Sequence, residues 1–229
     1  MAETPKLDGP RVAPRNGPAR QLVVFVHGYG ADGNDLIEIG RAWAAMLPDA
    51  AFVAPHAPRP CGQAPMGREW FPLTFRNPDE RWDGVNAAAP VLEQFLDAEL
   101  ARHQLAPSAL ALVGFSQGTM MSLHVGLRRA VPPAAIVGYS GMLVLKDDSD
   151  LEGYAPQIRA RPPLLLIHGD SDELIPTQAL FHATEALAAL EVPVEWHISA
   201  GLGHGIDDEG LRHGGEFLAQ RFRGLHARG

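Results

Sequence analysis

The sequence has a single cysteine, Cys61, among its 229 residues. One cysteine cannot form an internal disulfide, which agrees with a reducing compartment. Reactive cysteines need an electropositive setting, so Cys61 is expected to be an unreactive free thiol. The sequence also lacks any apolar run near the roughly 20 residues that span a bilayer, and its start lacks the apolar core of a signal peptide. We therefore expect a cytoplasmic protein without stable membrane insertion.

Positive charge is also scarce. The chain has 19 Lys and Arg against 27 Asp and Glu, which gives a formal net charge of −8. This balance argues against a surface that grips phosphate backbones or anionic lipid, so nucleic acid is not an expected partner. With 46% hydrophobic residues, the chain is long enough for one domain with a large core.

Apolar runs of strand length alternate with amphipathic stretches of helix length from Arg20 onward. This order is typical of βαβ units around a mostly parallel sheet with helices on both faces, the α/β class. Residues 1–19 are rich in Pro, Gly and charge and are expected to form an extended or mobile lead-in, with a single domain over 20–229. The expected strands are 22–26, 51–54, 109–114, 134–139, 164–167 and 194–199. The expected helices are 34–47, 85–105, 117–129, 177–190 and 207–222.

The segment from His56 to Asp83 interrupts this alternation with a long irregular stretch. It is longer than the loops that compact domains usually contain. Its apolar side chains are too many for a solvated loop; they are Met66, Trp70, Phe71, Leu73, Phe75 and Trp82. They could anchor the loop, wall a binding pocket, or form an interface, including one between two copies of the chain in a homodimer.

A nucleophile motif follows the third expected strand. Gly114-Phe115-Ser116-Gln117-Gly118 matches G-x-S-x-G and lies between the strand LALVG and the helix TMMSLHVGLRRA. A sharp strand-to-helix turn leaves little room beside the serine, which explains the two glycines. The turn should expose the Ser116 hydroxyl at the first N–H groups of the helix, so the Gln117 N–H becomes an oxyanion donor.

The base and the acid should follow the serine, in the order acid then histidine, on loops after strands. His204 is the histidine left after the others are removed by chain order or by their positions in predicted elements or the tail. It lies between the last strand and the last helix. For the acid, three carboxylates follow the strand 164–167: Asp170, Asp172 and Glu173, with Asp170 and Asp172 the main candidates. Spacing alone does not separate them.

The first strand ends in a glycine-rich turn, Val26-His27-Gly28-Tyr29-Gly30. It lacks the P-loop lysine and the dinucleotide spacing. Beside a serine nucleophile it is better explained as the second oxyanion donor, with the Tyr29 backbone N–H in that role. His27 is expected to hold this loop by hydrogen bonds.

Together, VHGYGADGND, GFSQG, LIHGDSDELIP and GLGHGID resemble the phospholipase/carboxylesterase family of α/β-hydrolases, from about Leu22 to Phe222. The resemblance implies a compact α/β-hydrolase fold without a large cap and a catalytic triad of Ser116, Asp172 and His204. It selects Asp172 as the acid. It also supports a pocket lined by Met66, Trp70, Phe71, Leu73, Met142 and Leu143. Tyr29 stands where the family often has Leu, and its bulkier side chain is expected to narrow the mouth of the pocket.

The expected function is therefore a serine carboxylesterase that acts on a small-molecule ester or thioester through an acyl-enzyme, without cofactor or metal. An acyl-protein thioesterase or lysophospholipase acting on long chains could use the same triad. A binding protein that kept the fold and lost catalysis is the alternative from another class. A cluster of Asp147, Asp148, Asp150 and Glu152 lacks the spacing of a calcium loop and is expected to be a solvated turn.

Overall fold

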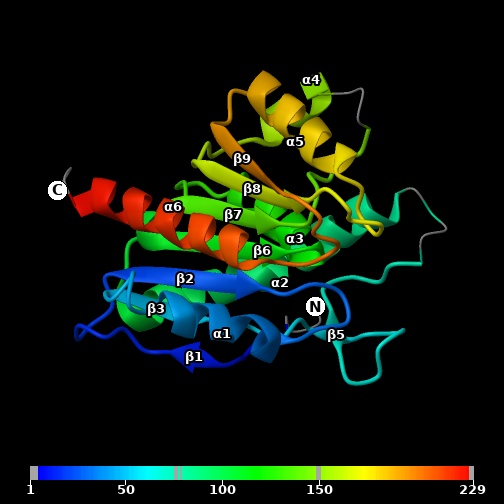
Figure 1. Cartoon of the computed structure of the whole chain (residues 1–229). Coiled ribbons are helices and arrows are strands. Elements are labelled where there is room, and N and C mark those ends of the chain that lie inside the picture. Colours follow the sequence, from blue (N-terminus) through cyan, green and yellow to red (C-terminus); the bar gives the residue numbers. More distant parts are fainter. Residues whose placement is uncertain (1–4, 75–76, 78, 148–150, 227–229) are drawn as a thin grey trace.

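A seven-stranded sheet forms the centre of the molecule, with strand order β1-β3-β2-β6-β7-β8-β9 (Figure 1). The computed structural model describes residues 5–74, 77, 79–147 and 151–226. All neighbouring strands are parallel except the edge strand β1, which is antiparallel to β3. The six strands predicted from the sequence are all present. They are β2 (Gln21–Val26), β3 (Ala50–Val53), β6 (Leu110–Phe115), β7 (Ala135–Tyr139), β8 (Leu164–Gly169) and β9 (Val194–Ser199).

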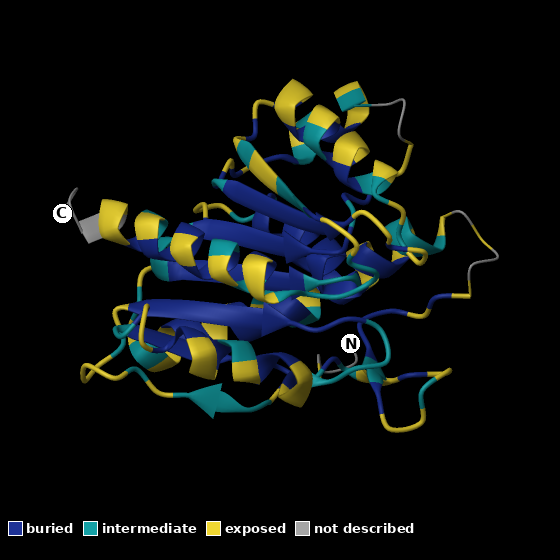
Figure 2. Ribbon diagram, in the orientation of Figure 1, coloured by how far each residue is buried: buried dark blue, intermediate teal, exposed yellow. Residues whose placement is uncertain are grey.

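Helices cover both faces of the sheet, and this explains why most strands are continuous apolar runs. One core joins α1 and α6 to one face, and the other core joins α2, α3 and α5 to the opposite face. Figure 2 shows the buried strands between helices whose outer surfaces are exposed. The bounds are α1 (Gly33–Trp43), α2 (Glu80–His103), α3 (Gln117–Gly126), α5 (Gln178–Ala189) and α6 (Asp208–His226). A mostly parallel sheet between two helical layers is the α/β-hydrolase arrangement expected from the sequence.

The N-terminal segment contributes to the sheet although no strand was expected there. Strand β1 (Arg11–Val12) pairs with Phe52 and Val53 of β3. Leu7 is buried in the core beneath α2, and Arg11 donates two hydrogen bonds to the buried Glu99 of α2. A two-residue edge strand leaves no periodic signal, so the Pro- and Gly-rich composition dominated the interpretation of residues 1–19.

The long segment after β3 contains two short strands that the sequence did not reveal, β4 (Arg59–Pro60) and β5 (Arg68–Glu69), which pair antiparallel. Helix α2 then begins at Glu80, earlier than expected. Two short helices, η1 (Pro107–Ala109) and η2 (Ala155–Gln157), and α4 (Leu151–Tyr154) were also not expected. Elements this short carry too few residues for a periodic pattern.

Candidate active site

Ser116 sits at the sharp turn between β6 and α3, at the carboxyl edge of the sheet. Its backbone has φ 53° and ψ −116°, a conformation that residues with a side chain rarely adopt. The Ser116 N–H donates to the Tyr139 carbonyl, and the Ser116 carbonyl accepts from the Thr119 N–H. These bonds hold the strained turn between two parallel strands and the first turn of α3.

The two glycines of the motif allow parts of the backbone to come very close at this turn. A Cβ at Gly118 would lie 1.7 Å from the Val26 carbonyl oxygen of β2, and a Cβ at Gly114 would lie 2.5 Å from backbone atoms of Gly118. Both distances are far below contact distance, and the obstructing atoms are backbone that cannot rotate away. Glycine is therefore required on steric grounds at both positions.

Ser116, His204 and Asp172 form a continuous hydrogen-bonded chain across three loops. The distance from His204 Nε2 to Ser116 Oγ is 2.9 Å, and from His204 Nδ1 to Asp172 Oδ2 it is 2.7 Å. A carboxylate can only accept, so Nδ1 donates to Asp172, and this leaves Nε2 with a lone pair facing the serine hydroxyl. The Phe115 ring lies 5.0 Å from the imidazole, centroid to centroid, and packs against it.

The Asp172 carboxylate is buried but well supplied with donors. Its Oδ1 accepts from the N–H groups of Leu174 and Ile175, each at 2.9 Å, and its Oδ2 accepts from His204. Burial alone would raise the pKa of Asp172, but the hydrogen bonds from Ile175, His204 and Leu174 outweigh it, so the pKa lies below its ordinary value. The carboxylate is thus ionised at neutral pH.

Asp170 lies in the same loop but has other partners. Its Oδ1 accepts from the Gly201 N–H at 2.7 Å and from the Ser171 hydroxyl at 2.9 Å. It therefore ties its own loop to the loop that carries His204. The two candidate acids that spacing could not separate thus differ clearly in their surroundings.

Further contacts position the His204 loop from both sides. The Ser140 hydroxyl donates to the Gly205 carbonyl at 3.0 Å. On the far side, Asp207 Oδ1 accepts from the Ser199 hydroxyl and from the Gly210 N–H. The sequence analysis missed both residues. The contact of Ser140 joins segments that are remote along the chain, whereas Asp207 acts within its own loop.

His168 is another residue that sequence reasoning set aside. It was excluded as a base because it precedes the acid. In the fold its side chain is buried, and Nε2 donates to the Ile175 carbonyl at 2.7 Å and lies 3.3 Å from Asp172 Oδ2. It thus braces the turn whose N–H groups bind Asp172. The HGD pattern at the end of the strand was the only signal for it.

The side chain of Gln117 connects the nucleophile turn to the long segment after β3. Its Oε1 accepts from the Trp70 N–H at 2.9 Å, and its Nε2 donates to the Phe71 carbonyl at 2.8 Å. Gln117 is fully buried. The amide side chain thus pairs with the backbone of this segment much as a neighbouring strand would, while the backbone N–H of Gln117 lies at the start of α3.

His27 completes this connection. Its Nε2 accepts from the Ala57 N–H and its Nδ1 donates to the Gly28 carbonyl, while the His27 carbonyl accepts from the Trp70 indole. Burial lowers the pKa of His27 to about 4. A neutral imidazole matches the acceptor role of Nε2, so His27 has a structural role at neutral pH.

The residues expected to line a pocket are divided among several hollows. Met142 and Leu143 line a cavity of about 170 Å³ with Pro176 and helix α5. Trp70 and Phe71 are buried and line a hollow of about 600 Å³ beside the start of α2. Met66 is 93% exposed at the rim of a third hollow beside Gly30, and Leu73 is buried in the core.

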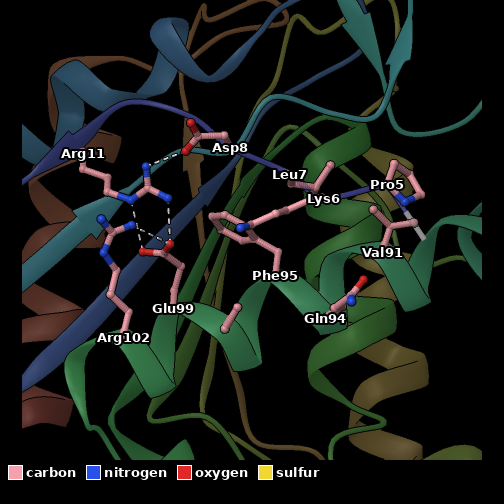
Figure 3. A pocket seen from close by; sticks show the side chains of 11 residues that line it. Pro5, Lys6, Leu7, Asp8, Arg11, Val91, Gln94, Phe95, Glu99 and Arg102 are labelled. Carbon is pink, nitrogen blue, oxygen red and sulfur yellow. Dashed lines mark hydrogen bonds and ion pairs between the residues drawn. The ribbon is translucent and has the colours of Figure 1, made fainter. Parts of the chain in front are cut away.

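A larger cavity, of about 790 Å³, lies between the N-terminal segment and α2 (Figure 3). Its floor is the ion-paired group of Arg11, Glu99 and Arg102, with Asp8 bonded to Arg11. None of the residues that line it belongs to the group around Ser116. The ion pair between Arg11 and Glu99 holds β1 against the helix, and Asp8 joins the segment before β1 to Arg11.

Two other expectations concern acidic residues and membranes. Of the cluster expected to form a solvated turn, Asp148 and Asp150 lie outside the described residues. Among the residues that the structure describes, no helix has the length and apolar character needed to cross a bilayer. Cys61 is buried and forms no disulfide.

Comparison with known proteins agrees with this architecture. The family model described as phospholipase/carboxylesterase matches residues 7–221. An esterase YpfH from Escherichia coli is 28% identical over 195 residues, 85% of this chain and 80% of that protein. An acyl-protein thioesterase 1 from Gibberella zeae is 28% identical over 230 residues, 92% of this chain and 96% of that protein.

Solved structures share the fold over nearly the whole chain. The crystal structure of esterase PE8 is 43% identical with a TM-score of 0.88, and the match covers 94% of this chain and 99% of that one. A Bacillus cereus carboxylesterase, at 12% identity and TM-score 0.76 over 94% of both chains, shows the likeness of fold alone. The chain belongs to the phospholipase/carboxylesterase family of α/β-hydrolases and is a serine hydrolase of esters or thioesters.

Proposed function

We propose that the protein is a carboxylesterase that works through an acyl-enzyme on Ser116, with His204 as base and Asp172 as its orienting acid. The observation that carries the proposal is the hydrogen-bonded chain from Ser116 Oγ through His204 to Asp172, at 2.9 and 2.7 Å. His204 Nε2 takes the hydroxyl proton as Oγ attacks the ester carbonyl, and then gives this proton to the leaving alcohol. Water, activated by the same nitrogen, releases the acid and regenerates Ser116.

The charge that develops on the carbonyl oxygen would be stabilised by the backbone N–H groups of Tyr29 and Gln117. Gln117 is the first residue of α3, so its N–H has no carbonyl partner within the helix. Among the described residues, the Tyr29 N–H donates to no other backbone group. Burial, together with the nearby Cys61 and Glu69, raises the pKa of the Tyr29 phenol, which places this side chain against the segment 61–69.

The cavity beside Met142 and Leu143 supports a short acyl group. Its volume of about 170 Å³ is below the roughly 300–1,000 Å³ of pockets that enclose drug-sized ligands. Its lining is mainly apolar, and Pro176 connects it to the loop that carries Asp172. A small carboxylic ester is therefore the substrate class that we propose.

The test compares Ser116→Ala with Ser171→Ala, an exposed serine next to Asp172 in the acid loop, on p-nitrophenyl acetate and butyrate. Loss of hydrolysis and of fluorophosphonate labelling in Ser116→Ala, with both retained in Ser171→Ala and an unchanged circular dichroism spectrum in each, is the expected result. Full activity in Ser116→Ala would overturn the proposal. A wild-type protein that neither hydrolyses nor labels would instead be a ligand-binding member of the fold.

A second function is hydrolysis of long-chain thioesters or lysophospholipids, and the match to an acyl-protein thioesterase over 92% of the chain favours the thioesters. Ester and thioester substrates of graded acyl length distinguish the two. A fall in kcat/KM beyond short acyl groups supports the carboxylesterase, and a rise supports the thioesterase or lysophospholipase.

A cytoplasmic location and a homodimer stay predictions. The buried, unpaired Cys61 agrees with a reducing compartment. Sedimentation velocity over a range of protein concentrations would measure self-association.

A further inference from the structure

Three side chains able to bind a metal ion meet where β9 lies beside α6, outside the triad. His197 comes from β9, and Glu209 and His213 come from α6. One ligand atom of each lies within 4.8 Å of the other two. Because Glu209 and His213 are one helical turn apart, they face the same side of α6, toward the edge strand. The cluster thus joins two elements that are separate in the chain.

The geometry is close to that of a metal centre. His213 Nε2 lies 3.6 Å from Glu209 Oε1, and the rings of His197 and His213 lie 4.4 Å apart, centroid to centroid. With metal bonds of about 2.0–2.1 Å, tetrahedral ligand atoms are about 3.4 Å apart. One pair is already near that spacing, and all three ligand atoms lie within 4.8 Å of one another.

His197 supplies a second, independent observation. Its Nε2 is buried and has no hydrogen-bond partner among the described residues. A buried polar atom without a partner is destabilising, and most such atoms in proteins are paired. Coordination of a cation by Nε2 would remove this penalty. The unpaired nitrogen therefore points to a missing ligand at this place.

Arg212 lies beside the cluster, and its positive charge would oppose a bound cation if it were not compensated. Its Nη2 donates to His213 Nε2 at 3.5 Å and lies 3.9 Å from Glu209 Oε1. Its other nitrogen, however, binds both oxygens of Glu216, at 3.0 and 3.3 Å. The guanidinium is thus balanced by a carboxylate that is not part of the cluster, and Glu209 remains available as a ligand.

We propose that His197, Glu209 and His213 form a Zn²⁺ site, with two imidazoles, one carboxylate and a water molecule as the fourth ligand. Imidazole and carboxylate suit zinc among the common divalent ions, and Mg²⁺ and Ca²⁺ prefer sites made only of oxygen. The ion would clamp the first turns of α6 to β9. This site is separate from the ester chemistry, and the proposal does not depend on the proposed function.

The experiment titrates the chelator-treated full-length protein with zinc sulfate by calorimetry and follows thermal unfolding. One zinc ion per chain is expected, with Tm higher by about 5–10 °C at a zinc concentration about 100 times Kd. His213→Ala should weaken binding at least about 100-fold, since loss of even an outer partner of a ligand costs about 10–100-fold. His103→Ala, in the last turn of α2, is the matched control and should bind normally.

Two further variants keep the test decisive. Glu209→Gln changes a carboxylate whose side chain is 59% exposed, so it should fold even if His213→Ala does not, and its zinc affinity should fall. His204→Ala should bind zinc normally if the triad is not the site. The proposal is overturned by no binding at millimolar zinc, by undiminished binding in Glu209→Gln, or by loss of binding in His204→Ala.

Discussion

The nucleophile turn and the segment from Ala57 to Leu73 are neighbours that are held in place by different means. At the turn, the backbones of α3 and β2 come so close that Gly118 has no room for a Cβ atom. Ser116 is held there in a strained backbone conformation. The segment makes two backbone hydrogen bonds, from the Gly30 N–H to the Arg68 carbonyl and from the Arg68 N–H to the Ala31 carbonyl, and is otherwise attached by buried side chains. Gln117 binds the backbone of Trp70 and Phe71, and His27 binds that of Ala57.

The difference indicates which part of the protein can vary. A turn determined by backbone contact admits almost no substitution, because backbone atoms cannot move to make room. The segment depends on buried side chains for much of its attachment, and its tip is exposed at Met66. We infer that the turn that carries Ser116 is constrained more strongly than this segment.

The largest expected effect is on the acid of the triad. Asp172→Asn should lower kcat by about 10⁴-fold, because an amide cannot hold His204 in the required tautomer or stabilise its charged form. Asp170→Asn is the matched change in the same loop, and its kcat should stay within about tenfold of the wild-type value. Steady-state kinetics on a short ester measures both, and equal losses in the two variants would contradict the assignment.

Next comes a comparison of one glycine from each region. Gly118→Ala should destabilise the protein by about 3–5 kcal/mol, since its Cβ must displace the β2 backbone. Gly62→Ala, in the side-chain-tied segment, meets nothing within 4 Å and should change stability by no more than about 1 kcal/mol. Urea denaturation gives both values. If Gly118→Ala is as stable as Gly62→Ala, the steric argument is wrong.

Acid should weaken the connection at His27. In the unfolded chain an imidazole takes up a proton near pH 6.5, whereas burial lowers the pKa of His27 in the fold to about 4. The unfolded state therefore binds more protons than the folded state between these pH values. The free energy of unfolding decreases as the pH is lowered through this window, by on the order of 3 kcal/mol at pH 4. The free energy of unfolding, measured from pH 7 to pH 4, checks this.

His124 contributes to the same pH dependence of stability, so replacing it separates its contribution from that of His27. It is buried on α3, where burial and then Arg128 lower its pKa to about 3, and its Nδ1 has no partner among the described residues. His124→Leu should therefore make the fall in stability less steep while the contribution of His27 remains. A stability that does not change between pH 6.5 and pH 4 in the wild-type protein would refute both assignments.

The smallest expected effect concerns the Gln117 side chain. Gln117→Leu leaves the Trp70 N–H and the Phe71 carbonyl buried without a partner, at a cost of about 1–3 kcal/mol. Met66→Ser at the exposed tip should change stability by less than about 0.5 kcal/mol. Thermal unfolding of both variants tests whether the segment depends on its buried bonds. A similar Tm for the two would mean that it does not.

Much of the central sheet could be predicted from the sequence, because long apolar runs and helical periodicity are local properties. All six predicted strands are present, and the helices begin within a few residues of their expected starts. The elements that were missed, such as β1 and β4, have two residues each. They form because a partner strand lies alongside, and the local sequence cannot show this.

The sequence by itself determined the chemistry-bearing residue types and their order: the serine on its glycine-flanked turn, then the acidic loop, then His204. Only the tertiary structure decided which side chains meet. It separates Asp172 from Asp170 by their partners, places His168 against the acid, and brings His197 beside His213. The physical reason is that hydrogen bonds and metal sites require atoms within a few ångströms, and for residues far apart in the chain that proximity is set by the order and register of the strands.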